Sequence, residues 1–200
     1  MQHKSSRSRS PSGVHKFSAE NLLSSHAAAL KSPRLRTAAL RVLAFDPGFE
    51  RLGVAVLEKE NGKEILKHSE CVHTSPSLSF PERLLELGEA AEKLIKKFKP
   101  SAVALEKVYF ENNAKTAMQI AGVTGMLSYI ASKNKLPVLQ YTPLEVKVAV
   151  TGYGKSDKRA VGLMVSKLVV LPVRKRLDDE LDAIAIGLTC LANSRYPHSK

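Results

Sequence analysis

Two acidic residues stand directly after short apolar runs that are typical of buried strands. Asp46 follows residues 42–45, and Glu106 follows residues 103–105. Burying a carboxylate without a partner is costly, so a counter-ion is expected at that end of the predicted sheet. Either acid could instead be solvated at the sheet edge or paired with a lysine such as Lys107. The pattern therefore indicates a cation-binding site without requiring one.

A third acidic group lies near the C-terminus, at residues 178–182. Asp179 and Asp182 are three residues apart, which places them on the same side of the helix expected there. Asp178 and Glu180 are predicted to complement the dipole of that helix, but this does not explain Asp182, which lies deeper among apolar residues. Carboxylate oxygens are the ligands that Mg²⁺ prefers, and two such ions can promote phosphodiester hydrolysis. The acids together favour a metal-dependent nuclease.

The elements that must position these acids follow from the apolar pattern. Stretches at 40–45, 51–59 and 64–73, the last two joined by Asn61-Gly62, predict a three-stranded antiparallel meander. Further strands are expected at 102–105 and 137–141, and helices at 79–98, 114–133, from 142 onward and at 178–193. This order predicts an α/β fold with a mixed five-stranded sheet and helices on its faces.

The charge of the chain favours a polyanionic partner. Its 31 Lys and Arg against 19 Asp and Glu give a formal net charge of +12. A nucleic-acid backbone is the commonest polyanion for such a surface, although a lysine-rich surface can also serve only solubility. No run of eighteen apolar residues occurs, so no membrane span is expected. Cys71 and Cys190 are too few for a disulfide framework or a zinc site, and we expect reduced thiols.

Residues 1–40 are rich in Ser and Arg and are predicted to be a disordered basic tail, separate from a folded domain at 41–195. Three interpretations of the tail stay open: a DNA-binding segment, an organellar transit peptide, or a spurious extension of the reading frame. The expected location is the cytoplasm, beside a bacterial nucleoid. A transit peptide would instead place the protein in an organelle.

The acids and their surroundings resemble the RuvC family of Holliday junction resolvases, which have an RNase H-like fold. Residues 46–48 with Gly53 are similar to the first catalytic motif of that family, residues 105–109 to the second, and residues 179–183 to the closing pair. The resemblance implies an enzyme that nicks paired strands of four-way junction DNA in recombination and repair. It also implies two Mg²⁺ ions, for which Mn²⁺ can substitute, bound by four catalytic residues: Asp46, Glu106, Asp179 and Asp182.

The resemblance extends to DNA contacts. Tyr109 stands where the family has an aromatic residue that stacks on an unpaired base, and Lys147 and Lys158 stand where family lysines contact the DNA backbone. Lys155 and Arg159 are expected to join this phosphate-binding patch. An ordinary packed tyrosine and solvated lysines are the alternatives.

Assembly is predicted on two grounds. A symmetric junction cut on two strands calls for two active sites related by a two-fold axis, hence a homodimer. The predicted helix 114–133 carries small residues that permit close helix approach: Ala114, Ala117, Ala121, Gly122 and Gly125. The resemblance also implies coupling to a branch-migration motor complex (RuvA/RuvB-like).

Three rival functions remain open from the sequence. One is another RNase H-like nuclease that acts on RNA or branched DNA, because junction specificity lies in the dimer and the basic loops. A second is an actin-like ATPase, since Asp-Pro-Gly before a hairpin is similar to its phosphate loop, but about 160 residues supply only one of its two lobes. The third, a catalytically inactive nucleic-acid-binding module, is disfavoured by the presence of all four acids.

Overall fold

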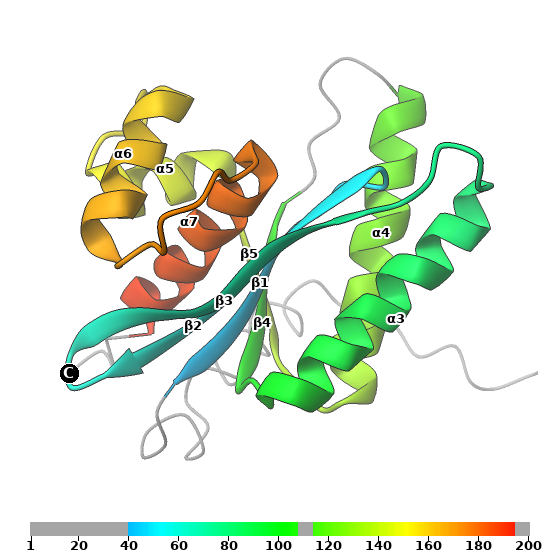
Figure 1. Cartoon of the computed structure of the whole chain (residues 1–200), viewed down its shortest axis with the longest axis horizontal. Coiled ribbons are helices and arrows are strands. Elements are labelled where there is room, and N and C mark those ends of the chain that lie inside the picture. Colours follow the sequence, from blue (N-terminus) through cyan, green and yellow to red (C-terminus); the bar gives the residue numbers. More distant parts are fainter. Residues whose placement is uncertain (1–39, 108–113, 195–200) are drawn as a thin grey trace, which may run out of the picture.

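The computed structural model describes residues 40–107 and 114–194 (Figure 1). The predicted base-stacking residue Tyr109 and almost all of the predicted tail lie outside the described residues. Among the described helices, none combines the length and the apolar character that crossing a membrane requires.

A mixed five-stranded sheet forms the centre of the molecule, as predicted, in the order β3-β2-β1-β4-β5. β1 pairs antiparallel with β2, and β2 with β3, whereas β4 and β5 run parallel to β1. Asn61 and Gly62 turn the β2–β3 hairpin with φ angles of 49° and 80°, the positive values that an Asn-Gly turn adopts readily. The strands are β1 (Arg41–Asp46), β2 (Arg51–Glu60), β3 (Lys63–His73), β4 (Ala102–Glu106) and β5 (Val138–Tyr141).

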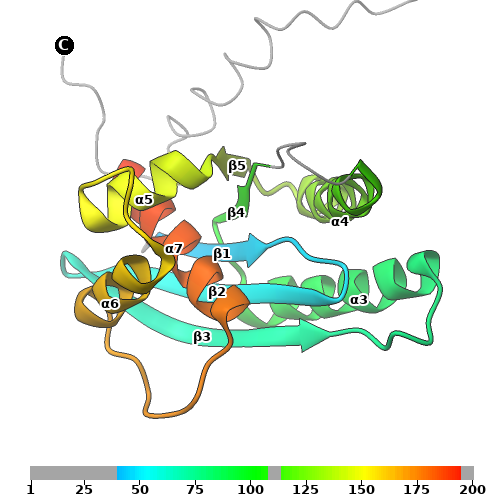
Figure 2. The ribbon, with the colours of Figure 1, turned by 90° about the horizontal axis from the view of Figure 1, so that it is seen from above.

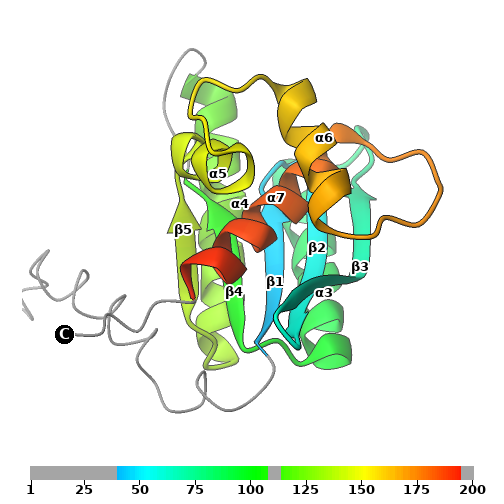
Figure 3. The same cartoon turned by 90° about the vertical axis from the view of Figure 1, so that its left-hand side faces the viewer.

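Helices cover both faces of the sheet, so the sheet separates two apolar cores (Figure 1). One face packs against α3 (Phe80–Phe98) and α4 (Ala114–Lys133). The other packs against α5 (Pro143–Thr151), α6 (Lys158–Leu168) and α7 (Asp178–Asn193). Figure 3 shows α7 crossing the sheet obliquely, with α5 and α6 farther from the sheet than α7.

The helix starts follow local sequence signals. α5 begins at a capping box, in which Glu145 N donates to Thr142 Oγ1 at 3.1 Å and Thr142 N donates to Glu145 Oε2 at 2.7 Å. α6 was not predicted, yet its N-cap is regular, because Asp157 Oδ1 accepts a hydrogen bond from Ala160 N at 2.7 Å. Capping at both starts fixes where the lysines of α5 and α6 lie.

α7 is the most deeply packed helix of the α5–α7 face. Every residue from 183 to 191 is buried, because the helix packs on β1 and β2 and is also covered by α5 and α6. Gly187 permits this approach, since a Cβ atom there would overlap Leu57 Cδ1 of β2 and lie 3.3 Å from Ala44 Cβ of β1. The first turn of α7, with its acids, is thereby held at one end of the sheet.

Candidate active site

The structure brings the predicted acids to the carboxyl ends of two adjacent strands. Asp46 is the last residue of β1 and Glu106 the last residue of β4. The two strands are parallel, and Phe45 pairs with Leu105, so the acids extend from the same edge of the sheet. α7 adds Asp179 and Asp182 from its first turns.

Gly53 lets the helix reach this edge. It lies opposite Asp46 in the β1–β2 register. A Cβ atom at Gly53 would overlap the carbonyl oxygen of Asp179 and approach Asp46 Cβ to 3.1 Å. The absence of a side chain at Gly53 is therefore what allows β1, β2 and α7 to meet.

The four acids act on one another electrostatically. Burial raises the pKa of Asp46 from 3.8 to about 7, and the charges of Glu106, Asp182 and Asp179 add to this rise. Burial also raises the pKa of Glu106, followed by the charge of Asp182. Burial likewise raises the pKa of Asp182, although Lys158 opposes this effect. The site concentrates more negative charge than its surroundings neutralise.

Two basic side chains already pair with acids of the site. Lys158 Nζ lies 2.9 Å from Asp182 Oδ2 and 3.6 Å from Asp178 Oδ2. Burial would lower the pKa of Lys158, but the hydrogen bond and charge of Asp182 raise it. Arg51 Nε lies 3.3 Å from Asp179 Oδ2. With the side chains in these positions, no three His, Cys, Asp or Glu residues of the described chain are grouped closely enough to hold a metal ion.

The donor set nevertheless fits a hard divalent cation. All four predicted ligands offer carboxylate oxygens, which suit Mg²⁺ or Mn²⁺ rather than zinc or copper. Asp179 Oδ2 is buried and accepts no hydrogen bond, although it pairs with Arg51, so a cation there would take the place of the guanidinium. Burial is the first cause of the raised pKa of Asp46, and a cation would relieve the repulsion from the other acids that adds to it.

A pocket of about 250 Å³ opens beside the acids. Glu106 and Asp182 line the pocket together with Lys147 of α5 and Lys158 of α6. Pro143, Val146, Val161 and Ile186 complete its apolar wall. Acids next to lysines in one cavity suit a phosphate group that is approached by metal ions from one side and by ammonium groups from the other.

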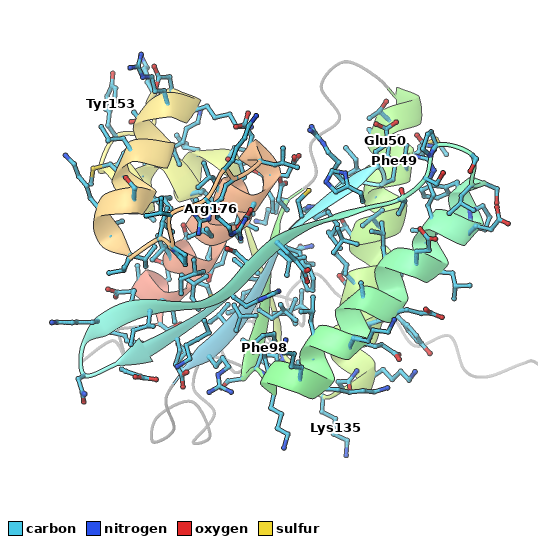
Figure 4. The ribbon with its side chains drawn as sticks, in the orientation of Figure 1. Phe49, Glu50, Phe98, Lys135, Tyr153 and Arg176 are labelled. Atoms are coloured by element: carbon cyan, nitrogen blue, oxygen red, sulfur yellow. The ribbon has the colours of Figure 1, made fainter. Side chains whose placement is uncertain are left out.

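The remaining predicted DNA-binding residues are placed differently. Lys155 and Arg159 are exposed on the segment before α6 and on its first turn, and they do not line this pocket. Tyr153, in the same segment, is 60% exposed, and Figure 4 shows it at the outer end of α5 and α6. Lys158, which is predicted to contact the DNA backbone, pairs with Asp182 in this structure.

Sequence reasoning missed how Glu180 is used. The residue lies in the first turn of α7, as predicted, but its side chain is only 3% exposed and does not serve the helix dipole alone. Arg174 and Arg176 both pair with it. The run Arg174-Lys175-Arg176 so close to the acids was the available signal, but such runs are usually solvated.

Metal-free protein should lose stability as the pH rises from about 4 to about 7. Folded Asp46, with its pKa of about 7, keeps a proton that the unfolded chain loses near its ordinary pKa of 3.8, so the free energy of unfolding falls across this window and then levels off. Asp46→Asn carries no charge and should be more stable than the wild type at about pH 8. Urea unfolding in EDTA at several pH values measures both; a variant less stable than the wild type at high pH would contradict this account.

Comparisons with known proteins agree with the site. The sequence profile of the family described as "Crossover junction endodeoxyribonuclease RuvC" matches residues 42–190. The RuvC of Ruminiclostridium cellulolyticum is 37% identical over 153 residues, covering 76% of this chain and 92% of that protein. The Thermus thermophilus RuvC structure superposes with a TM-score of 0.72 at 32% identity, covering 78% of this chain and 96% of that one.

A second structure shows Thermus thermophilus RuvC in complex with a Holliday junction substrate, with a TM-score of 0.73 at 32% identity. It covers 78% of this chain and 95% of that chain. Sequence and fold thus point to the same family. The chain therefore belongs to the RuvC family, whose members are metal-dependent crossover junction endodeoxyribonucleases.

Proposed function

We propose that this chain resolves Holliday junctions by nicking paired strands of four-way DNA, with two Mg²⁺ ions bound by Asp46, Glu106, Asp179 and Asp182. The observation that carries the proposal is the meeting of these acids at the ends of β1 and β4 and the start of α7, beside a pocket that also contains lysines. When bound, the two ions would supply the positive charge that stabilises the attacking and leaving oxygens of phosphodiester hydrolysis.

The residues of the chain divide the remaining work. Glu106 and Asp182 line the pocket and would hold the cations there, while Lys147 and Lys158 would attract the DNA backbone into it. Lys158 must leave Asp182 for this role, and a metal ion that takes over Asp182 would release it. Burial and the charges of the other acids raise the pKa of Asp46. Added positive charge would therefore stabilise the ionised form of this carboxylate.

Cleavage of three matched substrates tests the proposal. The full chain with Mg²⁺ is incubated with a four-way junction, a linear duplex of the same sequence and an RNA–DNA hybrid. We expect paired nicks in the junction and little cleavage of the other two. Preferred cleavage of the hybrid would support the rival RNase H-like activity instead.

Lys147→Ala or Lys158→Ala should weaken junction binding at every sequence. Each lysine lost removes one neutralised phosphate, so the salt dependence of the binding constant should flatten by about one counterion. Lys135→Ala is the matched control, because Lys135 is exposed at the opposite end of the molecule (Figure 4). Binding isotherms at several salt concentrations in EDTA measure the slope. An equal effect of Lys135→Ala would mean that the lysines act only through net charge.

The protein should form a homodimer through the exposed face of α4. Within the chain, Gly122 packs on Phe80, so it is not free for a partner helix. Met118 and Tyr129 are 71% and 66% exposed, and Gly125 between them has open space. Light scattering should give the mass of a dimer, and Tyr129→Glu should shift it towards the monomer. A wild-type monomer at micromolar concentration, with or without junction DNA, would contradict this.

The other implied features stay predictions. Coupling to a branch-migration motor complex would bring the resolvase to junctions that are being moved. A cytoplasmic location, or an organellar one if residues 1–40 are a transit peptide, would place it with the DNA it cuts. Duplex-binding assays of the chain with and without residues 1–40 would separate a DNA-binding tail from the alternatives.

A further inference from the structure

An ion cluster around the buried carboxylate of Glu180 lies at the start of α7 and includes Arg176 and the partly exposed Arg174. Glu180 Oε2 accepts a hydrogen bond from Arg174 Nη1 at 3.0 Å, and Glu180 Oε1 pairs with Arg174 Nη2 and with Arg176 Nε. Arg176 is itself only 7% exposed, and Figure 4 shows it close to α7. The cluster therefore has two guanidinium groups around one buried carboxylate.

The cluster ties the loop before α7 to the edge of the sheet. Residues 169–177 project beyond the edge strand β3 before the chain turns into α7 (Figure 2). Arg174 Nη2 also donates to the carbonyl oxygen of Ser69 on β3 at 2.8 Å. The guanidinium of Arg174 thus joins β3 to the first turn of α7. Arg174 and its partner Ser69 are 105 residues apart in the sequence.

This first turn is also where α7 contributes to the candidate active site. Asp179 directly precedes Glu180, and its carbonyl oxygen is packed on Gly53 of β2. Asp179 and Asp182 are predicted metal ligands, so a shift of the first turn would move both. Glu180 is held from the β3 side while Asp179 is held from the β2 side.

We propose that Arg174 and Glu180 are positioning residues for the metal site: their ion pair fixes the first turn of α7, so that Asp179 and Asp182 are held ready for the cations. This inference rests on the proposed metal-binding role of these aspartates. Partners behind a ligand set orient the ligands, and removing one typically costs about 10–100-fold in metal affinity or activity.

A second buried arginine–glutamate pair supplies the matched control. Arg41 Nη2 lies 3.0 Å from Glu58 Oε2, and Glu58 is 4% exposed. Arg41 is the first residue of β1, whereas Asp46 is its last, so this pair stands at the opposite end of the strand from the site. Removing Arg174 leaves Glu180 with Arg176 alone, and removing Arg41 leaves Glu58 with Lys67 alone, so both changes should destabilise the fold. Only the pair at α7 should affect metal binding.

The experiment compares Arg174→Ala with Arg41→Ala in the full chain. Titration calorimetry with Mn²⁺ in the absence of DNA gives the metal affinity, and thermal unfolding in EDTA gives the stability. Junction cleavage against metal concentration separates the half-saturating concentration from the maximal rate. We expect both variants to unfold at lower temperature, but only Arg174→Ala to weaken Mn²⁺ binding, by about 10-fold or more.

Two milder variants keep the test decisive if Arg174→Ala does not fold. Arg174→Lys can still pair with Glu180 and should retain part of the affinity, whereas Glu180→Gln removes the charge and should retain less. Unchanged Mn²⁺ affinity in Arg174→Ala, or in Glu180→Gln where Arg174→Ala does not fold, would overturn the inference. An equal loss in Arg41→Ala would also overturn it. Failure of the proposed function is distinguishable, because wild-type protein would then bind no Mn²⁺ and Asp46→Asn would leave cleavage unchanged.

Discussion

We expect Asp46→Asn to abolish junction cleavage while junction binding stays intact or becomes tighter. Asparagine keeps the size of the side chain but removes the charge that would hold a cation at the end of β1. Losing about 4 kcal/mol of transition-state stabilisation corresponds to a rate lower by about 10³-fold. Binding survives because the basic residues of α5 and α6 are untouched, and one negative charge fewer repels the phosphates less. Gel-shift binding in EDTA and single-turnover cleavage in Mg²⁺ measure the two effects separately.

Glu106→Gln and Asp182→Asn should behave in the same way, since both side chains line the pocket. Glu58→Gln is the control: Glu58 is a buried carboxylate that pairs with Arg41, remote from the site. That variant should lower stability and leave the cleavage rate of folded protein unchanged. Undiminished cleavage by any two of the three site variants would remove the catalytic assignment.

Gly53→Ala should cause the second largest loss of cleavage activity, although it replaces no charged residue. The new methyl would overlap the carbonyl oxygen of Asp179, so the first turn of α7 must move away from β2. Overpacking of this kind costs about 1–3 kcal/mol of stability. A displacement of about 1 Å at the two aspartates can lower the cleavage rate by about 10²-fold. Urea unfolding and single-turnover cleavage measure the two effects.

Gly162→Ala provides the contrast within the same half of the molecule. A Cβ atom there would meet only Leu181 Cδ1, at an ordinary 3.8 Å, and alanine favours the helical conformation of α6. This variant should be at least as stable as the wild type and equally active. Equal activity of Gly53→Ala would show that the contact between β2 and α7 does not position the acids.

The ends of the strands were predictable because each signal is local. An apolar run that stops at an acid defines both the strand and the side chain at its end, as at Asp46 and Glu106. The Asn61-Gly62 turn and the capping box at Thr142 likewise need only a few neighbouring residues. α6 was missed although its signal is also local: Asp157 caps it, and Val161 and Val165 are buried one turn apart.

The pairings of the basic residues were not predictable, because they depend on distant parts of the chain. Arg174 meets Ser69 and Arg51 meets Asp179 only after the sheet and α7 have assembled. For the same reason, the sequence alone does not show that Arg174 and Arg176 pair with Glu180, or that Lys158 pairs with Asp182. The acids of the site can be recognised in the sequence, whereas the tertiary structure decides which arginine and lysine side chains lie next to them.

The burial of α7 implies that the acidic and basic parts of the site move on different timescales. We expect its residues 183–191 to exchange their amide protons slowly, because exposing them requires the helix to leave β1 and β2. α5 and α6 carry the pocket lysines and are more exposed, with buried positions only at Val146, Val150, Val161 and Val165. We therefore expect α7, which bears the aspartates, to stay fixed. We expect α5 and α6, which bear the lysines, to adjust to a DNA strand before it is cut.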